Sequence, residues 1–157
     1  MTIEDIEIAV ANHWNIRGFV IVPNASWGAG VHECDLLILS SSGYLTEIEI
    51  KTTKADLVKD LKKEHQHRSD KIKQLYYALP DRVLNANETK KLIPARAGIL
   101  RIWKSEYGNY NCGMEREATI NKIAEPLSEV ERFQIARLGA MRVWDLKERI
   151  QKVREVM

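Results

Sequence analysis

The stretch HECDLLILSSSGYLTEIEIK at residues 32–51 decides the fold. It contains two runs, HECDLLILS and YLTEIEIK, separated by a Ser/Gly turn at residues 41–43. Two such runs around a short turn are typical of a β-hairpin. Because side chains alternate between the two faces of a strand, we expect Ile48 and Ile50 to face the core.

Five charged side chains are expected on the other face of this hairpin. By the same alternation, Glu33 and Asp35 share a face of the first strand, and Glu47, Glu49 and Lys51 share a face of the second. If the strands pair, four carboxylates and one lysine meet in one patch. Like charges this close repel unless a divalent cation neutralises them. The hairpin is therefore expected to hold a metal.

The chemistry of these residues favours metal-assisted hydrolysis of a phosphodiester. Mg²⁺ prefers oxygen ligands and takes one or two carboxylates, with water and substrate phosphate in its other positions. We expect Asp35 and Glu49 to supply the carboxylates and the backbone carbonyl of Ile50 to supply a third ligand. Lys51 lies on the same face, where it can orient an attacking water or stabilise charge on a phosphoryl group.

The motif formed by Asp35 and, after the hairpin, Glu49-Ile50-Lys51 resembles that of the PD-(D/E)XK nuclease superfamily. This superfamily includes restriction endonucleases, Holliday junction resolvases and DNA repair nucleases. The resemblance covers roughly residues 2–103, and Cys34 stands where the motif has proline.

The resemblance implies an α/β fold with a restriction-endonuclease-like αβββαβ core, a mixed sheet flanked by helices, and a C-terminal helical extension. It also implies a deoxyribonuclease that uses Mg²⁺ or Mn²⁺ in DNA repair, recombination or phage DNA processing. In many members a glutamate of the first helix joins the site. Here that glutamate is Glu7, with Glu4 in reserve.

The remaining segments follow an α/β pattern. Helices are predicted over residues 2–15, 55–64 and 81–92 and from Ser128 onward, with KIKQ at 71–74 as a further helical turn. Strands are predicted over 18–23, where Pro23 closes the strand, and over 75–80 and 97–103. We expect a nuclease-like core at 1–114 and a helical extension at 115–157, packed on or beside it in a single domain. Trp144, in an apolar stripe, is expected in the core.

The net charge of +2 conceals an asymmetry. Residues 1–50 contain seven Asp or Glu against Arg17 alone, whereas residues 51–73 contain eight Lys or Arg and four acids. A solvated helix face is one interpretation of this basic segment. The other is a DNA-binding surface next to the carboxylates, formed by Lys54, Lys62, Lys63, Arg68, Lys71 and Lys73, with Trp27 either stacking on a base or closing the pocket.

Four further residues have less certain roles. Glu33 and Glu47 either support the metal ligands, bind a second metal or lie at the surface, and the surface is favoured. His65 and His67 lie two apart and do not share a helix face, so surface or DNA-facing positions are favoured over metal binding.

Composition excludes some classes of protein. No apolar stretch approaches the length of a membrane span, and the acidic start MTIEDIEIAV lacks the pattern of a signal peptide. Cys34 and Cys112 are too few for a disulfide framework, so reduced thiols in a cytoplasmic protein are expected.

Two functions of different classes follow. The first is the metal-dependent nuclease, with DNA as its partner. The alternative is a non-catalytic module that keeps the nuclease fold and binds nucleic acid or a partner protein. The long C-terminal helix offers an interface, and we expect it to support a homodimer.

Overall fold

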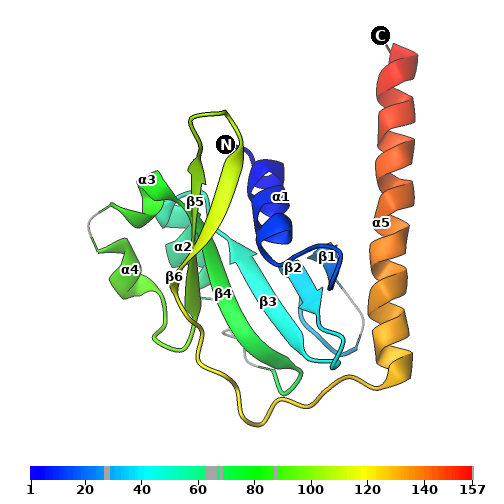
Figure 1. Cartoon of the computed structure of the whole chain (residues 1–157), viewed down its shortest axis with the longest axis horizontal. Helices are drawn as coiled ribbons and strands as arrows, with labels where there is room; N and C mark the ends of the chain where they lie inside the picture. Colours follow the sequence, from blue (N-terminus) through cyan, green and yellow to red (C-terminus); the bar gives the residue numbers. More distant parts are fainter. Residues whose placement is uncertain (27–28, 63–66, 68, 87, 157) are drawn as a thin grey trace.

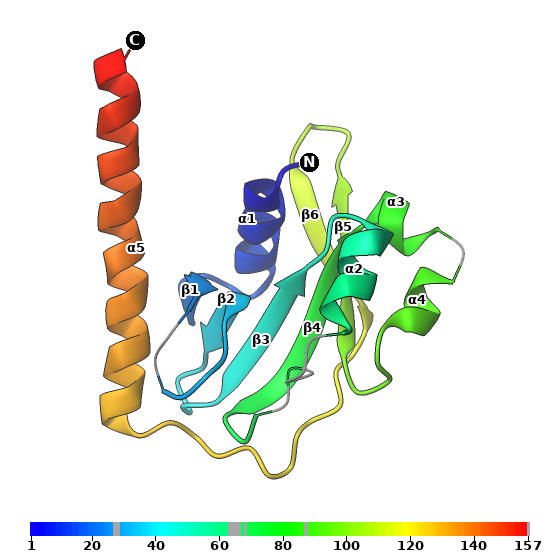
Figure 2. The same cartoon turned by 180° about the vertical axis from the view of Figure 1, so that it is seen from behind.

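The protein is a six-stranded mixed sheet with helices on both faces (Figures 1 and 2). The computed structural model describes residues 1–26, 29–62, 67, 69–86 and 88–156. The elements run in the order α1 (Ile3–His13), β1 (Val20–Ala25), β2 (Cys34–Leu39), β3 (Leu45–Ile50), α2 (Lys54–Asp60), β4 (Ile72–Pro80), α3 (Asp81–Leu84), α4 (Thr89–Leu92), β5 (Gly98–Lys104), β6 (Tyr110–Arg116) and α5 (Glu129–Val156). The predicted α/β class is confirmed, and the first six elements have the expected αβββαβ order.

The strands lie in the sheet in chain order, from β1 to β6. β1, β2 and β3 form an antiparallel meander, β3, β4 and β5 are parallel, and β6 returns antiparallel to β5. The predicted hairpin is β2 and β3, in which Leu36 is opposite Ile48 and Leu37 is opposite Glu47. Parallel strands need a crossover connection, and the segment that contains α2 supplies it between β3 and β4.

One face of the sheet is covered by α1. Thr2 caps this helix, and Thr2 and Asp5 exchange the two hydrogen bonds of a capping box. The buried stripe of α1 packs on alternate residues of β2, β3, β4 and β5, in a cluster that includes Ile6, Ala9, Val10, Leu36, Ile38, Ile48, Ile50, Tyr76, Ala78, Leu100 and Ile102. As expected, Ile48 and Ile50 therefore face this core.

The opposite face is covered at one end by α5 and at the other by α2, α3 and α4. Near α5 the cluster includes Val22, Leu37, Leu39, Leu45, Ile135 and Leu138, and near α2 it includes Leu57, Leu75, Tyr77, Leu79, Val83 and Ile99. Glu47 and Glu49 also lie on this face and are 0% and 1% exposed. Glu47 and Glu49 are thus buried between two apolar clusters instead of lying in solvent.

Four predicted boundaries need correction. β1 continues through Pro23, which sits opposite Leu36; this is tolerated because β1 is an edge strand with one unpaired side. The KIKQ segment is the start of β4, not a helical turn, because its backbone pairs with β3. The helix predicted over 81–92 is two short helices, α3 and α4. The helix predicted over 55–64 is α2, which ends at Asp60. The division between core and extension at residue 114 stays a prediction; β6 runs to Arg116.

The long C-terminal helix begins as predicted, because Ser128 and Glu131 form a capping box. Its first half packs against β1, where Ile135 and Leu138 are buried and Arg142 donates to the carbonyl of Asn24. Its second half extends past β1 in both views (Figures 1 and 2). Trp144 lies there and is 64% exposed, so the expectation that it belongs to the core is wrong. In the part of the chain that the structure describes, no helix has the length and apolarity needed to cross a membrane.

Candidate active site

The site is built where β2 begins and β3 ends. Asp35 is the second residue of β2 and Glu49 is the fifth of β3, so the antiparallel register sets them side by side. The Asp35 carboxylate accepts a hydrogen bond of 2.7 Å from the Ile50 amide. The Asp35 side chain is 38% exposed, whereas that of Glu49 is 1% exposed. The pair therefore has one carboxylate at the surface and one beneath it.

Lys51 connects these carboxylates. Its ammonium lies 2.6 Å from Glu49 Oε2, 3.4 Å from Asp35 Oδ2 and 3.2 Å from Asp60 Oδ1. The lysine is held in place because its amide donates to the carbonyl of Ala78 on β4. Burial by itself would lower the pKa of Lys51, but the surrounding carboxylates, Glu49 foremost, raise it. Burial raises the pKa of Glu49, and Lys51 counteracts part of that rise. Lys51 is therefore a buried cation held among carboxylates.

Asp60 is a member of the site that the sequence patterns did not predict. It ends α2 and is 3% exposed. Its Oδ2 accepts from the Tyr77 hydroxyl at 3.1 Å and lies 2.9 Å from His67 Nε2. The sequence carried a signal, because Asp60 follows the buried Leu57 by three residues and so lies on the same helix face.

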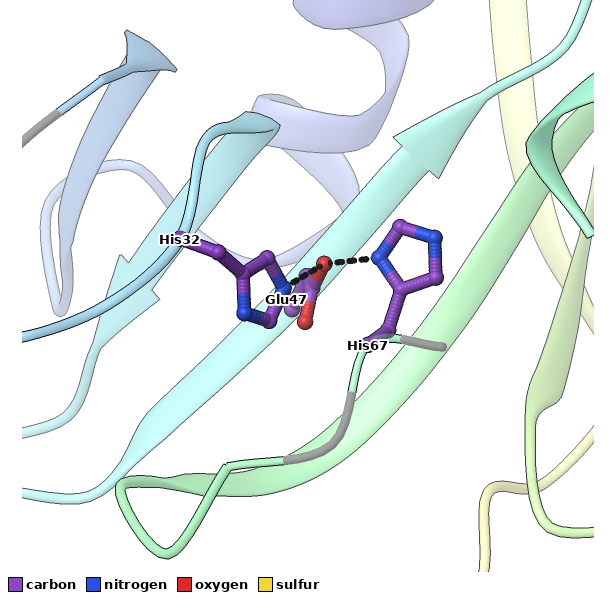
Figure 3. A group of neighbouring side chains, drawn as sticks. All are labelled: His32, Glu47 and His67. Carbon is purple, nitrogen blue, oxygen red and sulfur yellow. Dashed lines mark hydrogen bonds and ion pairs between the residues drawn. The ribbon is translucent and has the colours of Figure 1, made fainter. Parts of the chain in front are cut away.

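Glu47 lies deeper on β3, between two histidines (Figure 3). His32 Nε2 is 2.7 Å and His67 Nδ1 is 2.6 Å from the same oxygen, Glu47 Oε1. Burial would raise the pKa of Glu47, but the hydrogen bonds and charges of the two histidines lower it. Burial would lower the pKa of His67, but its bonds to Asp60 and Glu47 raise it to about 9. The favoured surface positions for Glu47 and His67 are therefore wrong, because both side chains are buried and paired.

The other predicted members of the site are more scattered. Glu33 precedes β2 and is exposed, so the structure does not bring it into the carboxylate cluster. Asp60 joins the cluster in its place. Glu7 on α1 is half-buried; burial raises its pKa, and Glu4 and Asp35 raise it further. That influence places Glu7 within electrostatic reach of Asp35. Whether the Ile50 carbonyl is a ligand stays a prediction.

The predicted DNA-binding residues separate into three groups. Lys54, at the start of α2, and Lys62, just after its end, are exposed near the site. Lys71 and Lys73 lie at the start of β4. The Lys71 ammonium is 3.3 Å from a Glu131 carboxylate oxygen, and the Lys73 ammonium is 3.4 Å from the centre of the Tyr44 ring. Since β4 runs parallel to β3, those two lysines are at the opposite end of the sheet from Lys51. Three further predicted DNA-binding residues lie outside the described residues, namely Trp27, Lys63 and Arg68, and so does His65.

Comparison with known proteins identifies a protein of similar fold but no activity. No family model and no curated protein matches the chain. Among solved structures, the chain is similar to the SPO1766 protein of unknown function from Silicibacter pomeroyi. The two share 23% sequence identity with a TM-score of 0.61, over 95% of this chain and 88% of that chain. At this identity the likeness shows a shared fold alone, so the chemistry of the site has to be inferred from its own geometry.

Proposed function

We propose that this protein is a metal-dependent deoxyribonuclease of the PD-(D/E)XK type, acting in DNA repair, recombination or phage DNA processing. The observation that carries the proposal is the contact of the Lys51 ammonium with both Asp35 and Glu49. These are the three residues that define the motif: Asp35 and Glu49 lie on neighbouring strands, and Lys51 follows directly after the second strand. The αβββαβ order of the first elements supports the same proposal.

The donor atoms of this site fit Mg²⁺ or Mn²⁺. Asp35 and Glu49 offer carboxylate oxygens, which are the ligands these hard cations prefer. The Ile50 carbonyl is the third proposed ligand. A bound cation would polarise the scissile phosphate and lower the pKa of a bound water.

The protein's own residues would position the substrate and the charge around it. Asp35, with 38% of its side chain exposed, marks where a phosphate would approach. Lys51 lies next to Asp35 and is suited to stabilise negative charge on the phosphoryl oxygens or to orient water. Glu7 adds a further acidic group from α1. Lys54 and Lys62 are exposed beside the site and are suited to contact the DNA backbone, which positions DNA without reading its sequence.

A plasmid-nicking assay tests this function. Supercoiled, linear, single-stranded and branched DNA are incubated with the protein and Mg²⁺, Mn²⁺ or EDTA. Asp35→Asn is the test variant because Asp35 is half-exposed and the change is isosteric. Asp70→Asn, an exposed aspartate ahead of β4, is the matched control. We expect metal-dependent cleavage by the wild type and by Asp70→Asn, and none by Asp35→Asn. Equal cleavage by all three proteins would show that a contaminant or another site is responsible.

One observation favours the alternative function, a module that binds DNA or a partner without cutting it. Glu49 and Lys51 are 1% and 5% exposed and already neutralise each other, as in a purely structural ion pair. DNA binding without cleavage of any of the four substrates would support this alternative.

Both functions agree with a cytoplasmic location, which we propose because Cys34 and Cys112 are free thiols.

A further inference from the structure

A second set of ligand atoms lies beside the Asp35–Lys51 pair and serves no purpose in the proposed hydrolysis. It consists of Glu47 on β3, His32 from the segment before β2, and His67 from the segment between α2 and β4 (Figure 3). The ligand atoms of these three side chains all lie within 4.8 Å of one another. Glu47 and His67 are buried, while His32 is 16% exposed and lies at the rim.

The Glu47 carboxylate is incompletely satisfied. Both imidazoles contact Oε1, whereas Oε2 is buried and has no hydrogen-bond partner among the described residues. Buried carboxylate oxygens are almost always hydrogen-bonded or bound to a cation, because an isolated one is costly. Glu47 Oε2 is therefore an unsatisfied oxygen on the carboxylate that both histidines contact.

His67 is oriented in the way that metal-binding histidines are. Its Nδ1 faces Glu47, and its other ring nitrogen, Nε2, lies 2.9 Å from Asp60 Oδ2. The Tyr77 hydroxyl donates to the same Asp60 oxygen at 3.1 Å. A carboxylate that holds the second nitrogen of a histidine fixes the ring and strengthens the first nitrogen as a ligand. The chain from Tyr77 through Asp60 therefore aims His67 Nδ1 at Glu47.

We propose that His32, Glu47 and His67 bind a divalent transition metal of the zinc class. Two imidazole nitrogens and one carboxylate oxygen suit zinc better than magnesium, which selects oxygen ligands alone. Zinc bonds of about 2.0–2.1 Å place tetrahedral ligands roughly 3.4 Å apart, so each histidine would have to move from Glu47 Oε1 by about 0.7 Å. Small rotations of the side chains provide that movement.

The cluster borders a cavity and the Asp35–Glu49 site. A cavity of about 410 Å³ is lined by Asp60, His67, Tyr77 and Arg96, among others, and reaches the His67 side of the cluster. Glu49 Oε1 lies 3.8 Å from His67 Nδ1, so the zinc site would adjoin the Asp35–Glu49 site while using different ligands. It would also tie the segment that contains His67 to the middle of β3.

Zinc binding to the purified, tag-free protein tests this proposal. The protein is treated with chelator, dialysed, and titrated with Zn²⁺ by calorimetry, and Co²⁺ is added in parallel to record the absorption of a tetrahedral site. The test variant is His32→Gln, at the rim, where a substitution disturbs the fold least. His13→Gln, on the exposed side of α1, is the matched histidine control, and Asp35→Asn removes the neighbouring site alone. Circular dichroism checks that each variant is folded.

We expect one Zn²⁺ per chain in the wild type, His13→Gln and Asp35→Asn, and an affinity at least about tenfold weaker in His32→Gln. The Co²⁺ bands should weaken in His32→Gln only. Zinc binding that is absent from the wild type, or unchanged in His32→Gln, would overturn the proposal. A loss in Asp35→Asn with none in His32→Gln would place the ion in the carboxylate site and overturn it as well.

An independent observation concerns the second half of α5. Val143, Leu146, Ile150 and Val153 follow one another at spacings of three, four and three residues, and are 43–59% exposed. This is the spacing of the a and d positions of a coiled coil, so the four residues form one apolar seam. No other described element lies beside this part of the helix in either view (Figures 1 and 2).

The charges beside the seam indicate which kind of helix can bind it. Lys147, Arg149 and Arg154 take the flanking e and g positions, and acids lie on the outer positions, at Asp145, Glu148 and Glu155. In a pair of identical helices the e and g positions face each other or themselves, so basic residues would meet basic residues. A second copy of this helix is therefore a poor occupant, and these charges argue against the homodimer expected from the sequence.

We infer that the seam binds an amphipathic helix of a partner protein with acidic residues beside its apolar stripe. The test uses the full chain and two labelled synthetic peptides of about three heptads, with Ile and Leu at a and d. One peptide has Glu at every e and g position, and the other has Lys. Ile150→Asp disrupts the seam, and Phe133→Ser, an exposed apolar residue off the seam, is its control.

We expect the Glu peptide to bind at least about tenfold more tightly than the Lys peptide, and Ile150→Asp but not Phe133→Ser to lose binding. The triple variant Lys147→Glu, Arg149→Glu and Arg154→Glu should reverse the preference. Equal affinities, or no binding, would overturn the inference. So would a dimer of the wild type in sedimentation that Ile150→Asp dissociates, because a second copy would then occupy the seam.

Discussion

The Asp60 carboxylate at the end of α2 lies 3.2 Å from the Lys51 ammonium just past the end of β3. The contact links two groups of charged residues, which also approach each other where His67 Nδ1 lies 3.8 Å from Glu49 Oε1. On one side Lys51 contacts Asp35 and Glu49, and on the other Asp60 contacts His67, which reaches Glu47. A change at either group therefore reaches the other through Asp60.

Asp60→Asn should lower the free energy of unfolding by about 3 kcal/mol, measured by urea denaturation. The substitution keeps the shape of the side chain but removes the charge that faces Lys51 and His67, and breaking a buried pair leaves the partners uncompensated. Asp56→Asn, exposed on the same helix, should change the stability by less than about 0.5 kcal/mol. Equal effects of the two substitutions would show that the buried contacts of Asp60 contribute nothing.

Lys51→Met should abolish DNA cleavage and leave Mn²⁺ binding intact. The lysine is proposed to act on water and phosphate, and its removal leaves Asp35 and Glu49 free to hold the cation. Calorimetric titration with Mn²⁺ beside the nicking assay separates the two properties. Lys59→Met, exposed on α2, should retain both. Normal cleavage by Lys51→Met would show that Lys51 is not needed for catalysis.

DNA binding should depend on the lysines around α2 and not on those at the start of β4. Each phosphate contact contributes about −0.9 to the slope of log affinity against log salt on duplex DNA. Lys54→Gln with Lys62→Gln should flatten that slope by up to about two units, whereas Lys71→Gln with Lys73→Gln should leave it unchanged. Fluorescence anisotropy over a range of salt concentrations measures both. A slope that changes only in the Lys71→Gln and Lys73→Gln variant would indicate that DNA binds at the start of β4 instead.

Gly43→Ala should destabilise the protein more than Gly108→Ala. Both glycines have positive φ, +88° and +86°, so both substitutions incur the strain of a left-handed backbone, about 1–2 kcal/mol. At Gly108 the space is open, but at Gly43 the new Cβ would meet the Arg132 guanidinium. Arg132 donates there to the carbonyls of Ser41 and Ser42, which anchor α5 to the β2–β3 turn. Thermal unfolding of the two variants compares them, and equal losses of stability would show that Arg132 anchors nothing.

Local chemistry in the sequence determined the hairpin and the helix starts. The apolar runs around residues 41–43 form β2 and β3, and Thr2 and Ser128 cap α1 and α5 at the predicted helix starts. The strand period also placed Asp35, Glu49 and Lys51 together, because residues two apart share a face and the short turn sets the register. These features depend on neighbours within a few residues, which a sequence displays directly.

Only the tertiary structure decided what surrounds that face. Alternation tells which face Glu47 occupies, but its burial depends on α2 and on the segment that brings His67 from 20 residues away. Lys71 and Lys73 follow α2 closely in the sequence, yet β4 begins at the far end of the sheet, because a parallel strand must start level with the beginning of its neighbour. Asp60 likewise reaches the site through the crossover, Tyr77 through the strand that follows it, and His32 through the segment before β2. Burial and long-range pairing depend on how distant segments pack, and the pattern within each segment does not contain that information.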